Sequence, residues 1–237
     1  MHVEQMGEDI SVAADGGVAR IPLFAGMQQA DIARLATRMR RRTYRQGDVI
    51  FHKGDPGSML YLVEQGQIKI FTPSLEGREV VLCLFGPGDF FGEMALFDDK
   101  PRSASAEAAT PSTLLTLQRD DFRQAMVQHP AMSLAVMAAL VNRLRRTDEM
   151  LEDAVFLDLP SRLAKKLLEL AESHGVPTDT GFDIDLRLSQ QDLADMVGAT
   201  RARVNEVLVW YRDRGIIGMH RSHFTILKPD GLRRISQ

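Results

Sequence analysis

The chain has 237 residues, enough for one large or two modest domains, and its 44% hydrophobic and 26% charged residues exclude disorder over most of its length. Its single cysteine, Cys83, excludes an internal disulfide and a cysteine-ligated iron–sulfur cluster, which fits a reducing, cytoplasmic setting. The net charge of −3 argues against a uniformly basic surface, the acidic N-terminus is unlike a secretory signal, and no apolar run approaches the roughly 18–20 residues of a membrane-spanning helix.

The first half of the chain is predicted to contain a loose extension, a short helix and then many short strands. Residues 1–20 are small, polar and aperiodic, whereas Asp31–Arg41 has the apolar spacing of an amphipathic helix. From Tyr44 to about Leu117, glycine-containing turns separate apolar runs at residues 49–51, 60–63, 68–71 and 80–85. Strands that recur every 8–12 residues or so are typical of a sandwich or barrel.

A long helix with a heptad seam is predicted next, because Ala131 to Leu157 contains no proline or glycine. Its apolar positions follow a 3-4 rhythm at Leu134, Met137, Val141, Leu144, Leu151 and Val155. Such a seam favours the pairing of two long helices, so a homodimer is expected; the alternative is one helix that lies on its own sandwich. Asp148 occupies the remaining seam position, where a carboxylate needs a partner.

The segment Asp158-Leu159-Pro160 breaks the long helix and marks a hinge. A further helix is predicted over Ser161–Ser173, and residues 174–187 are predicted as a loop and a strand. The next helix, Leu188–Met196, contains a capping serine and an acidic residue in its first turn.

The sequence that follows predicts a winged helix-turn-helix. Val197-Gly198-Ala199 forms a tight turn, Thr200 caps a second helix over Arg201–Arg212, and residues 216–219 and 223–227 form a closing hairpin. From Val197 onward, eight Lys and Arg residues stand against three Asp and Glu residues, a net charge of +5. This asymmetry indicates a DNA-contacting module; a basic face that is merely solvated is the alternative.

The most informative segment is FGEMALF…PRSASA, which spans residues 91–106. Gly92 permits close backbone approach, and a short helical turn after it would direct N–H groups at an anion. Arg102 offers a cationic fork for a phosphate, and Ser103 adds a hydroxyl donor. Glu93 accepts hydrogen bonds only, so it suits a ribose hydroxyl. These side chains together predict a nucleoside monophosphate as the ligand.

This segment resembles the phosphate-binding cassette of the cyclic AMP receptor proteins, within the wider group that includes the fumarate–nitrate regulators. The resemblance extends from about Leu23 to Leu227 and includes the turn glycines, the long helix, the AVFLDLPSRLAKKLLEL hinge and the helix-turn-helix in family order. It implies an α+β chain with an N-terminal cyclic-nucleotide-binding β-roll (jelly roll), a long dimerisation helix and a C-terminal winged helix-turn-helix. The expected parts are a flexible N-terminal extension (1–20), the sensor domain (21–129), the dimerisation helix and hinge (130–158) and the DNA-binding domain (159–237).

By this resemblance, nine residues form the ligand site: Gly92, Glu93, Met94, Ala95, Arg102, Ser103, Arg143, Thr147 and Asp148. Arg143 matches the arginine that pairs with the ribose-binding glutamate. Thr147 and Asp148 match the positions that meet the base, the second contributed across the dimer. The expected effector is cyclic AMP.

Asp148 departs from the family, which usually has a small hydroxyl residue at this position. A carboxylate can accept the adenine amino group, but it suits the N1–H and N2 donors of guanine better, so cyclic GMP is the alternative effector. A second alternative is that Asp148 lies at the surface and pairs with Arg145 or Arg146.

The resemblance also assigns the DNA-reading residues, which are Ser189, Thr200, Arg201, Ala202, Arg203 and Glu206. Arg201 matches the arginine that reads guanine. Ala202 replaces a family glutamate and Glu206 a later base-reading arginine, so the half-site is expected to differ from the usual one. Ser189 and Thr200 are expected to bind phosphate and Arg203 a phosphate or a base. Glu206 either accepts from cytosine N4 or balances Arg203.

No catalytic triad and no histidine cluster with metal-ligand spacing occurs, so no enzyme activity, cofactor or metal is expected. Cys83 and His52 are not expected to sense redox state or bind haem.

The predicted function is transcription regulation. Ligand binding shifts the dimer toward the arrangement that sets two recognition helices roughly 34 Å apart on a palindromic double-stranded operator. RNA polymerase is an expected partner and a membrane is not. The alternatives are a ligand-independent DNA-binding protein with a vestigial cassette, or a nucleotide-binding module that acts through proteins.

Overall fold

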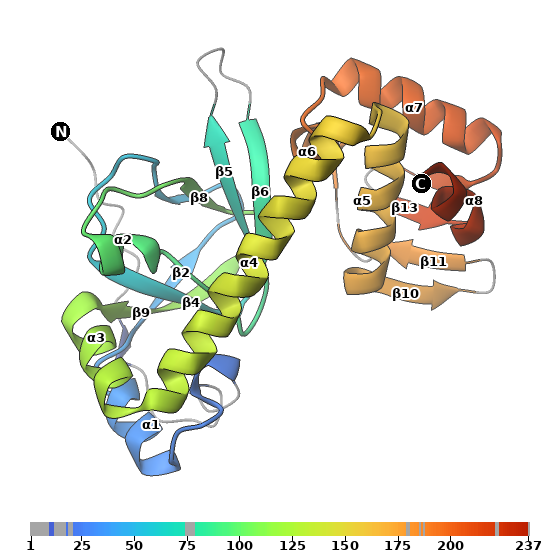
Figure 1. Ribbon diagram of the computed structural model, residues 1–237. Helices are drawn as coiled ribbons and strands as arrows, with labels where there is room; N and C mark the ends of the chain where they lie inside the picture. The colour runs from blue at the N-terminus through green and yellow to red at the C-terminus, as the bar shows by residue number, and fades with distance from the viewer. Residues whose placement is uncertain are drawn as a thin grey trace. The chain divides into compact units, whose positions relative to one another are not determined.

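The computed structural model (Figure 1) describes residues 10–11, 18, 21–73, 79–178, 181–184, 186, 188–220 and 223–236. The chain divides into two compact units. The first comprises the residues up to Pro73 together with Leu82–Leu144, and the second comprises the rest of the chain. The first unit is rich in strands, and the second is a helical unit with a small sheet (Figure 1).

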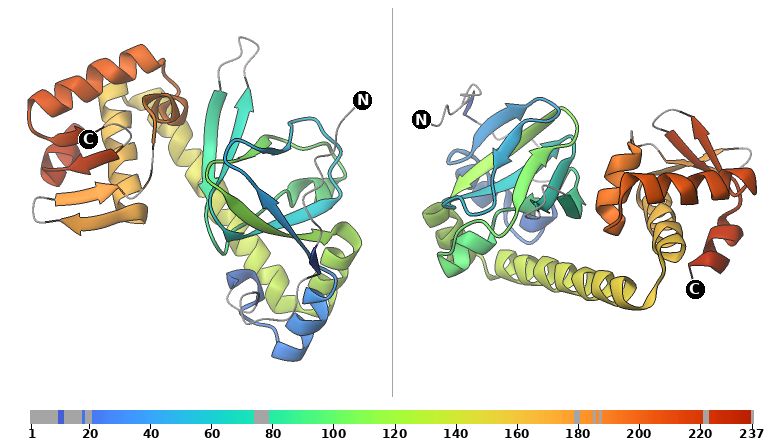
Figure 2. Two further views of the ribbon diagram at one scale, coloured as in Figure 1. Left: turned by 180° about the vertical axis from the view of Figure 1, so that it is seen from behind. Right: turned by 90° about the horizontal axis from the view of Figure 1, so that it is seen from above.

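Two sheets form the β-roll of the first unit, as Figure 2 shows from behind and from above. The first sheet has the order β1 (Ile10–Ser11), β2 (Arg40–Tyr44), β9 (Ser112–Gln118), β4 (Met59–Gln65) and β7 (Phe90–Phe91), and all its pairings are antiparallel. The second has the order β3 (Val49–Phe51), β8 (Ser105–Ala108), β5 (Ile68–Pro73) and β6 (Glu79–Phe85). These strands confirm the four predicted apolar runs and the predicted fold class.

Strand β4 contributes to two cores because its side chains alternate between the two faces of the sheet. Leu60 and Leu62 belong to the cluster that contains residues of the helices, whereas Tyr61 and Val63 belong to a cluster that includes residues of the second sheet. All four are buried, which explains why this strand appears in the sequence as a continuous apolar run rather than an alternating one.

The helices of the first unit are the 3-10 helix η2 (Pro22–Phe24), α1 (Gln29–Ala36), α2 (Met94–Asp98), α3 (Arg119–Gln128) and α4 (Pro130–Phe156), the last of which continues into the second unit. The predicted helix over Asp31–Arg41 is wrong beyond Ala36, because Arg40 and Arg41 pair with β9 as part of β2. The expectation of a loose extension is wrong at Ile10–Ser11, which pair with Arg40 and Arg41. Apart from Val18, which is buried, the rest of residues 1–20 lie outside the described residues.

Helix α4 is one uninterrupted helix in every view (Figures 1 and 2). Met132 and Val136 are buried against the core of the first unit. The six predicted seam residues are instead 49–66% exposed, namely Leu134, Met137, Val141, Leu144, Leu151 and Val155. The helix therefore has one apolar side inside its own unit and a second apolar stripe with no cover within the described chain.

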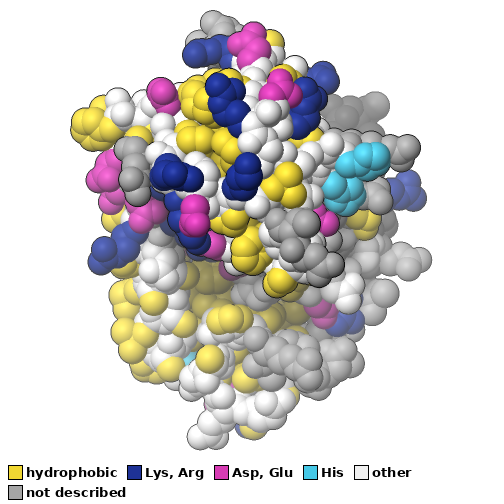
Figure 3. Space-filling model, turned by 90° about the vertical axis from the view of Figure 1, so that its right-hand side faces the viewer, with side chains coloured by type: hydrophobic (Ala, Val, Ile, Leu, Met, Phe, Trp, Pro, Cys, Tyr) yellow, Lys and Arg dark blue, Asp and Glu magenta, His cyan; other side chains and the backbone are white. Residues whose placement is uncertain are grey.

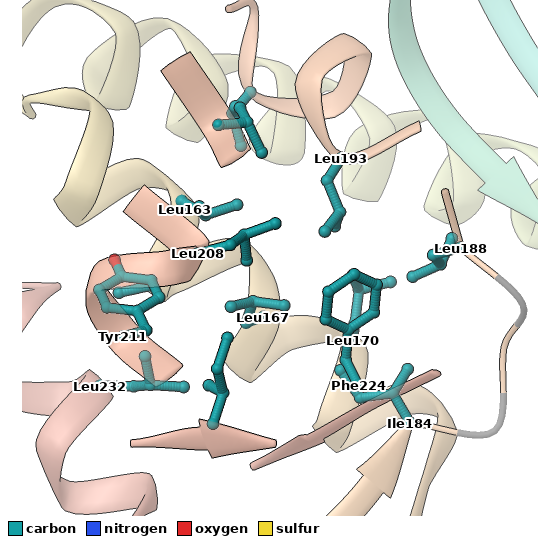
Figure 4. Packing of buried hydrophobic residues seen from close by; sticks show 14 of the residues in the cluster. Leu163, Leu167, Leu170, Ile184, Leu188, Leu193, Leu208, Tyr211, Phe224 and Leu232 are labelled. Atoms are coloured by element: carbon teal, nitrogen blue, oxygen red, sulfur yellow. The ribbon is translucent and has the colours of Figure 1, made fainter. Parts of the chain in front are cut away.

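The second unit contains α5 (Leu159–His174), α6 (Gln190–Val197), α7 (Arg201–Asp213), α8 (Pro229–Ile235) and a four-stranded antiparallel sheet. The sheet has the order β10 (Gly175–Thr178), β11 (Gly181–Ile184), β13 (His223–Ile226) and β12 (Ile217–His220). Figure 4 shows the shared core, to which the helices contribute Leu163, Leu167 and Leu208 and the sheet contributes Phe224. The helix break before Leu159, the two helices and the closing hairpin are as predicted, whereas β10 and α8 were not predicted.

The break between α4 and α5 has a defined capping structure. The Asp158 carboxylate accepts from the Ser161 backbone N–H at 2.9 Å and so caps α5, whose first turn holds Pro160. The Tyr211 hydroxyl of α7 donates to the Pro160 carbonyl at 2.5 Å, and burial raises the pKa of this hydroxyl.

Among the described residues no single helix is long and apolar enough to cross a membrane. Helices α3 and α4 reach that length and composition only when they are counted together, and they meet at a bend of 112°.

Candidate functional site

Arg102 lies at the centre of the cassette and is only 5% exposed. Its guanidinium donates to the carbonyl oxygens of Gly92 at 2.5 Å and Met59 at 2.9 Å, and its Nε has no hydrogen-bond partner among the described residues. The rings of Phe51 and Tyr61 lie beside it, with centroids 4.4 and 5.6 Å from Cζ. Burial lowers the pKa of this guanidinium, although Tyr61 and Glu93 oppose the shift. A buried cation with an unused donor is suited to bind an anion.

Gly92 lets the Arg102 guanidinium lie close to the backbone, whereas its predicted approach to an anion stays a prediction. Its φ of +80° lies in the left-handed region that favours glycine, and a Cβ at this position would lie 2.6 Å from Nη1 of Arg102. The short α2 follows at once, as expected from the sequence. Ala95 is buried, whereas Met94 is half exposed and its sulfur accepts from the exposed Ser103 hydroxyl at 3.5 Å. The structure therefore brings these cassette residues together around Arg102.

Glu93 joins the cassette to the long helix. Its carboxylate is almost fully buried and accepts from Nη1 of Arg143 at 2.8 Å. The Arg143 guanidinium also donates to the Phe90 carbonyl and lies against the Phe85 and Phe90 rings, with Cζ 4.5 and 4.7 Å from their centroids. The predicted glutamate–arginine pair is present, and the two aromatic rings that orient it were not predicted because they lie far from Arg143 in sequence.

Thr147 and Asp148 lie on the exposed surface of α4, one turn beyond Arg143. Asp148 shares the exposed apolar stripe of that helix, since it stands between Leu144 and Leu151 in the 3-4 rhythm. Within the described residues it forms no ion pair with Arg145 or Arg146. The role of Thr147 and Asp148 toward the base stays a prediction.

The helix-turn-helix is formed by α6 and α7, and both are capped as the sequence predicts. Ser189 and Asp192 form a capping box, in which the Ser189 hydroxyl accepts from the Asp192 N–H at 3.1 Å and the Ser189 backbone N–H donates to the Asp192 carboxylate at 2.7 Å. The Ser189 hydroxyl also donates to this carboxylate at 2.7 Å. Gly198 ends α6 with φ +64°, and the Thr200 hydroxyl accepts from the Arg203 N–H at 3.4 Å. The Ser189 hydroxyl is thus satisfied within its own cap, which weakens the expectation that it binds phosphate.

The first turns of α7 present side chains to solvent. Arg201, Ala202, Arg203 and Glu206 are exposed, whereas Val204 is buried in the core of the unit. No ion pair joins Arg203 to Glu206 in the described part of the chain, so both side chains are available to other partners. On the face that Figure 3 turns to the viewer, Lys and Arg side chains are interspersed with acidic and hydrophobic ones.

Comparisons with known proteins agree with this arrangement. Residues 41–129 match the cyclic nucleotide-binding domain family, and residues 161–235 match the Crp-like helix-turn-helix domain family. This chain belongs to the Crp family of transcription regulators. Its relatives are named as regulators and not as enzymes, so the interpretation that the chain is not an enzyme is confirmed.

Two curated relatives and one solved structure illustrate the range of the Crp family. The CRP-like cAMP-activated global transcriptional regulator of Mycobacterium tuberculosis is 34% identical over 92% of this chain and 97% of its own length. The cyclic AMP receptor protein of Thermus thermophilus is 35% identical over 83% and 88%. The c-di-GMP responsive global regulator CLP of Xanthomonas campestris has a TM-score of 0.77 at 27% identity and covers 84% of this chain and 99% of that one. The names of the first two specify cyclic AMP, whereas the third is named for cyclic di-GMP.

Proposed function

We propose that this Crp-family chain is a homodimeric, sequence-specific DNA-binding regulator and that its effector is cyclic AMP. Arg102 is the observation that carries the proposal. Its guanidinium is fixed by two carbonyl oxygens, lies against aromatic rings and keeps a buried Nε without a partner among the described residues. A phosphate would offset the cost of burying this cation, and the missing Cβ of Gly92 leaves room for the guanidinium beside the backbone.

Cyclic AMP is proposed over other nucleotides because the names of two relatives, 34% and 35% identical, specify it. A single phosphate also matches a cassette with one buried guanidinium. Asp148 favours cyclic GMP as the alternative effector, since its carboxylate can accept hydrogen bonds from two donors of guanine. The solved relative named for cyclic di-GMP makes that dinucleotide the third ligand to test.

The proposed dimer rests on the exposed stripe of α4. Six apolar side chains along it are about half exposed or more, and they recur at the 3-4 spacing of a coiled-coil seam. Covering such a stripe with a second copy would remove apolar surface from water, at roughly 25 cal/mol per Å². Two identical helices paired in this way give two recognition helices related by a twofold axis, as a palindromic operator requires.

The proposed allosteric link is the Glu93–Arg143 pair. A ribose hydroxyl that donates to Glu93 would share the carboxylate with an arginine of the dimerisation helix. Ligand binding would then favour one arrangement of α4, and the same coupling would make DNA binding favour the ligand. On this proposal Arg201 reads guanine, Arg203 and Thr200 contact the DNA backbone, and RNA polymerase and the cytoplasm are the proposed partner and location.

Calorimetric titration of the full chain with cyclic AMP, cyclic GMP and cyclic di-GMP tests the ligand, with Arg102→Lys as the variant that keeps the charge but loses the fork. We expect heat with cyclic AMP for the wild type and a much weaker response for the variant. Mobility shifts on a randomised duplex pool, with and without cyclic AMP, test the DNA reader. No heat with any nucleotide, together with DNA binding that ignores them, would mean a vestigial cassette; nucleotide binding without DNA binding would mean a module that acts through proteins.

A further inference from the structure

A second arginine lies behind the cassette. Arg119, the first residue of α3, directs its guanidinium at the carbonyl oxygens of Gly57 and Ala95 and at the carboxylate of Asp99. The Nη2 to Ala95 oxygen distance is 3.0 Å, and the side chain is 27% exposed. Gly57 precedes β4 and Ala95 lies on the cassette helix α2, so one guanidinium ties two separate segments of the first unit to α3.

Arg123, one turn further along α3, reinforces this arrangement. Its Nε donates to the Leu96 carbonyl at 2.8 Å, and its Nη2 lies 3.5 Å from the Asp99 carboxylate. Helix α2 has only five residues, and an isolated helix of that length is unstable in water. Its position therefore depends on the partners that α3 supplies to its carbonyl groups.

Gly57 connects Arg119 to Arg102. A Cβ built on Gly57 would lie 2.5 Å from the Ala95 Cβ and 3.0 Å from both Cζ and Nε of Arg102. The backbone of Gly57 thus forms the surface on which the Arg102 guanidinium rests. Because Arg119 holds the Gly57 carbonyl, it also fixes the position of that surface.

We propose that Arg119 is a positioning residue of the nucleotide site. It does not face the phosphate; it holds Gly57 and α2 in the arrangement in which Arg102 presents its fork. This inference rests on the proposed function, in which Arg102 meets the phosphate of a cyclic nucleotide. Arg119 lies outside the FGEMALF…PRSASA segment and is not among the nine residues that the family resemblance assigns to the ligand site.

The first test compares Arg119→Gln with Arg38→Gln in the full-length chain. Arg38 is the matched control, because its guanidinium also bonds to α3, at Asp121 and Gln124, but has no contact with the cassette. We expect Arg119→Gln to weaken cyclic AMP binding about tenfold and Arg38→Gln to leave it unchanged. Amide hydrogen exchange over α2 should accelerate in Arg119→Gln alone.

A double-mutant cycle separates positioning from general destabilisation. If Arg119 acts through Arg102, the affinity lost on Arg119→Gln should shrink in an Arg102→Lys background. Equal losses in both backgrounds would overturn the proposal, and so would unchanged exchange over α2. A wild-type chain that binds no cyclic nucleotide would overturn the proposed function instead, and the exchange measurement would still decide whether Arg119 holds α2.

The Gly57 contact gives a test that leaves Arg119 intact. Gly57→Ala should displace Arg102 and weaken cyclic AMP binding at least tenfold, because its Cβ has no room. Adding Ala95→Gly removes the nearest clashing atom and should restore part of the affinity. Gly86→Ala is the control, since a Cβ there meets no atom within 4 Å. Equal affinities in Gly57→Ala and Gly86→Ala would contradict the role assigned to this surface.

Discussion

Asp153 near the end of α4 and Lys165 on α5 form an ion pair across the hinge, with 2.7 Å between carboxylate oxygen and Nζ. Both side chains are partly buried, at 21% and 33% exposed. The pair connects α4 and α5, which are separate helices because the helical conformation is interrupted at Leu157 and Asp158. Burial opposes the charge on Lys165, yet the bond to Asp153 prevails and raises the pKa of the ammonium.

Breaking this pair is expected to destabilise the second unit modestly. Lys165→Met and Asp153→Asn should each lower the free energy of unfolding by about 0.5–1 kcal/mol, and the charge-reversed double variant should recover part of the loss. Since the folded pKa of Lys165 is raised, its contribution is fully present below the ordinary lysine pKa and disappears as the pH rises through the folded value. Urea unfolding at neutral and alkaline pH measures this, and strict additivity of the two single variants would rule out a direct interaction.

The Asp158 cap predicts the opposite dependence on pH. The backbone N–H of Ser161 lowers the pKa of this carboxyl group, so the folded state binds protons less readily than the unfolded state. The cap's charge-dependent contribution is therefore full above the ordinary aspartate pKa and declines as the pH falls through the folded value. We expect Asp158→Ala to cost about 0.5–2 kcal/mol at neutral pH, and less in acid.

Asp158→Asn supplies the control, because an amide caps a helix without titrating. Its stability relative to wild type should be lowest at neutral pH and should approach the wild type in acid. Thermal unfolding followed between pH 3 and pH 7, a range set by the ordinary carboxyl value near 4, makes the comparison. A constant difference across that range would show that the charge of Asp158 has no part in the cap.

Local patterns predicted much of this structure because they depend on neighbouring residues. The apolar stripe of α4 follows from heptad spacing, and the start of α7 follows from Thr200 as a cap. Arg40 and Arg41 were assigned to a helix wrongly because their conformation is set by β9, more than 70 residues away. That contact is nonlocal, so helical periodicity alone could not find it.

The cassette shows the same division between local and distant information. Gly92, Glu93 and Arg102 are close in sequence, and their residue types alone indicate a phosphate and a ribose. The Met59 carbonyl and the Phe51 ring that fix Arg102 come from strands some 40 to 50 residues earlier. Backbone carbonyls carry no residue-specific signal, so only the folded chain reveals them as partners.

The exposed stripe of α4 predicts that one added charge weakens the proposed dimer. Leu144→Glu places a carboxylate at a seam position that is 61% exposed in the single chain, so the fold should survive while the dimer weakens. Glu149→Lys is the control, since it alters charge at an exposed position of the same helix outside the seam and its flanking positions. Sedimentation equilibrium should show a monomer for the first variant only; two dimeric variants would place the interface elsewhere.

Asp148 predicts an effect on nucleotide choice. Asp148→Ser should lower affinity for cyclic GMP more than for cyclic AMP, because only guanine presents two donors to a carboxylate. The expected change in the ratio of the two affinities is about tenfold, the size of one lost charged hydrogen bond. Glu149→Ser removes the neighbouring exposed carboxylate and should leave the ratio unchanged. An unaltered ratio in both variants would mean that Asp148 does not contact the base.

The exposed Arg201 at the start of α7 predicts a loss of DNA affinity and of base selectivity when it is removed. Arg201→Ala should cost about 1–3 kcal/mol of binding and relax selectivity at one base pair, because a bidentate contact to guanine is lost. Arg212→Ala is the matched control, since this arginine lies at the far end of α7 and pairs with Asp213. Selection from a randomised duplex pool, followed by affinity measurement at one fixed salt concentration, reports both effects.

Glu206 and Ala202 predict how the operator differs from that of other Crp-family members. If Glu206 accepts from a cytosine amino group, then Glu206→Gln should reduce the preference for that base pair while the affinity for other sequences stays the same. Ala202→Glu together with Glu206→Arg should shift the selected half-site, because the first change adds an acceptor and the second replaces an acceptor by a donor fork, both at exposed positions. An identical set of selected sequences for the wild type and the double variant would show that neither position faces the bases.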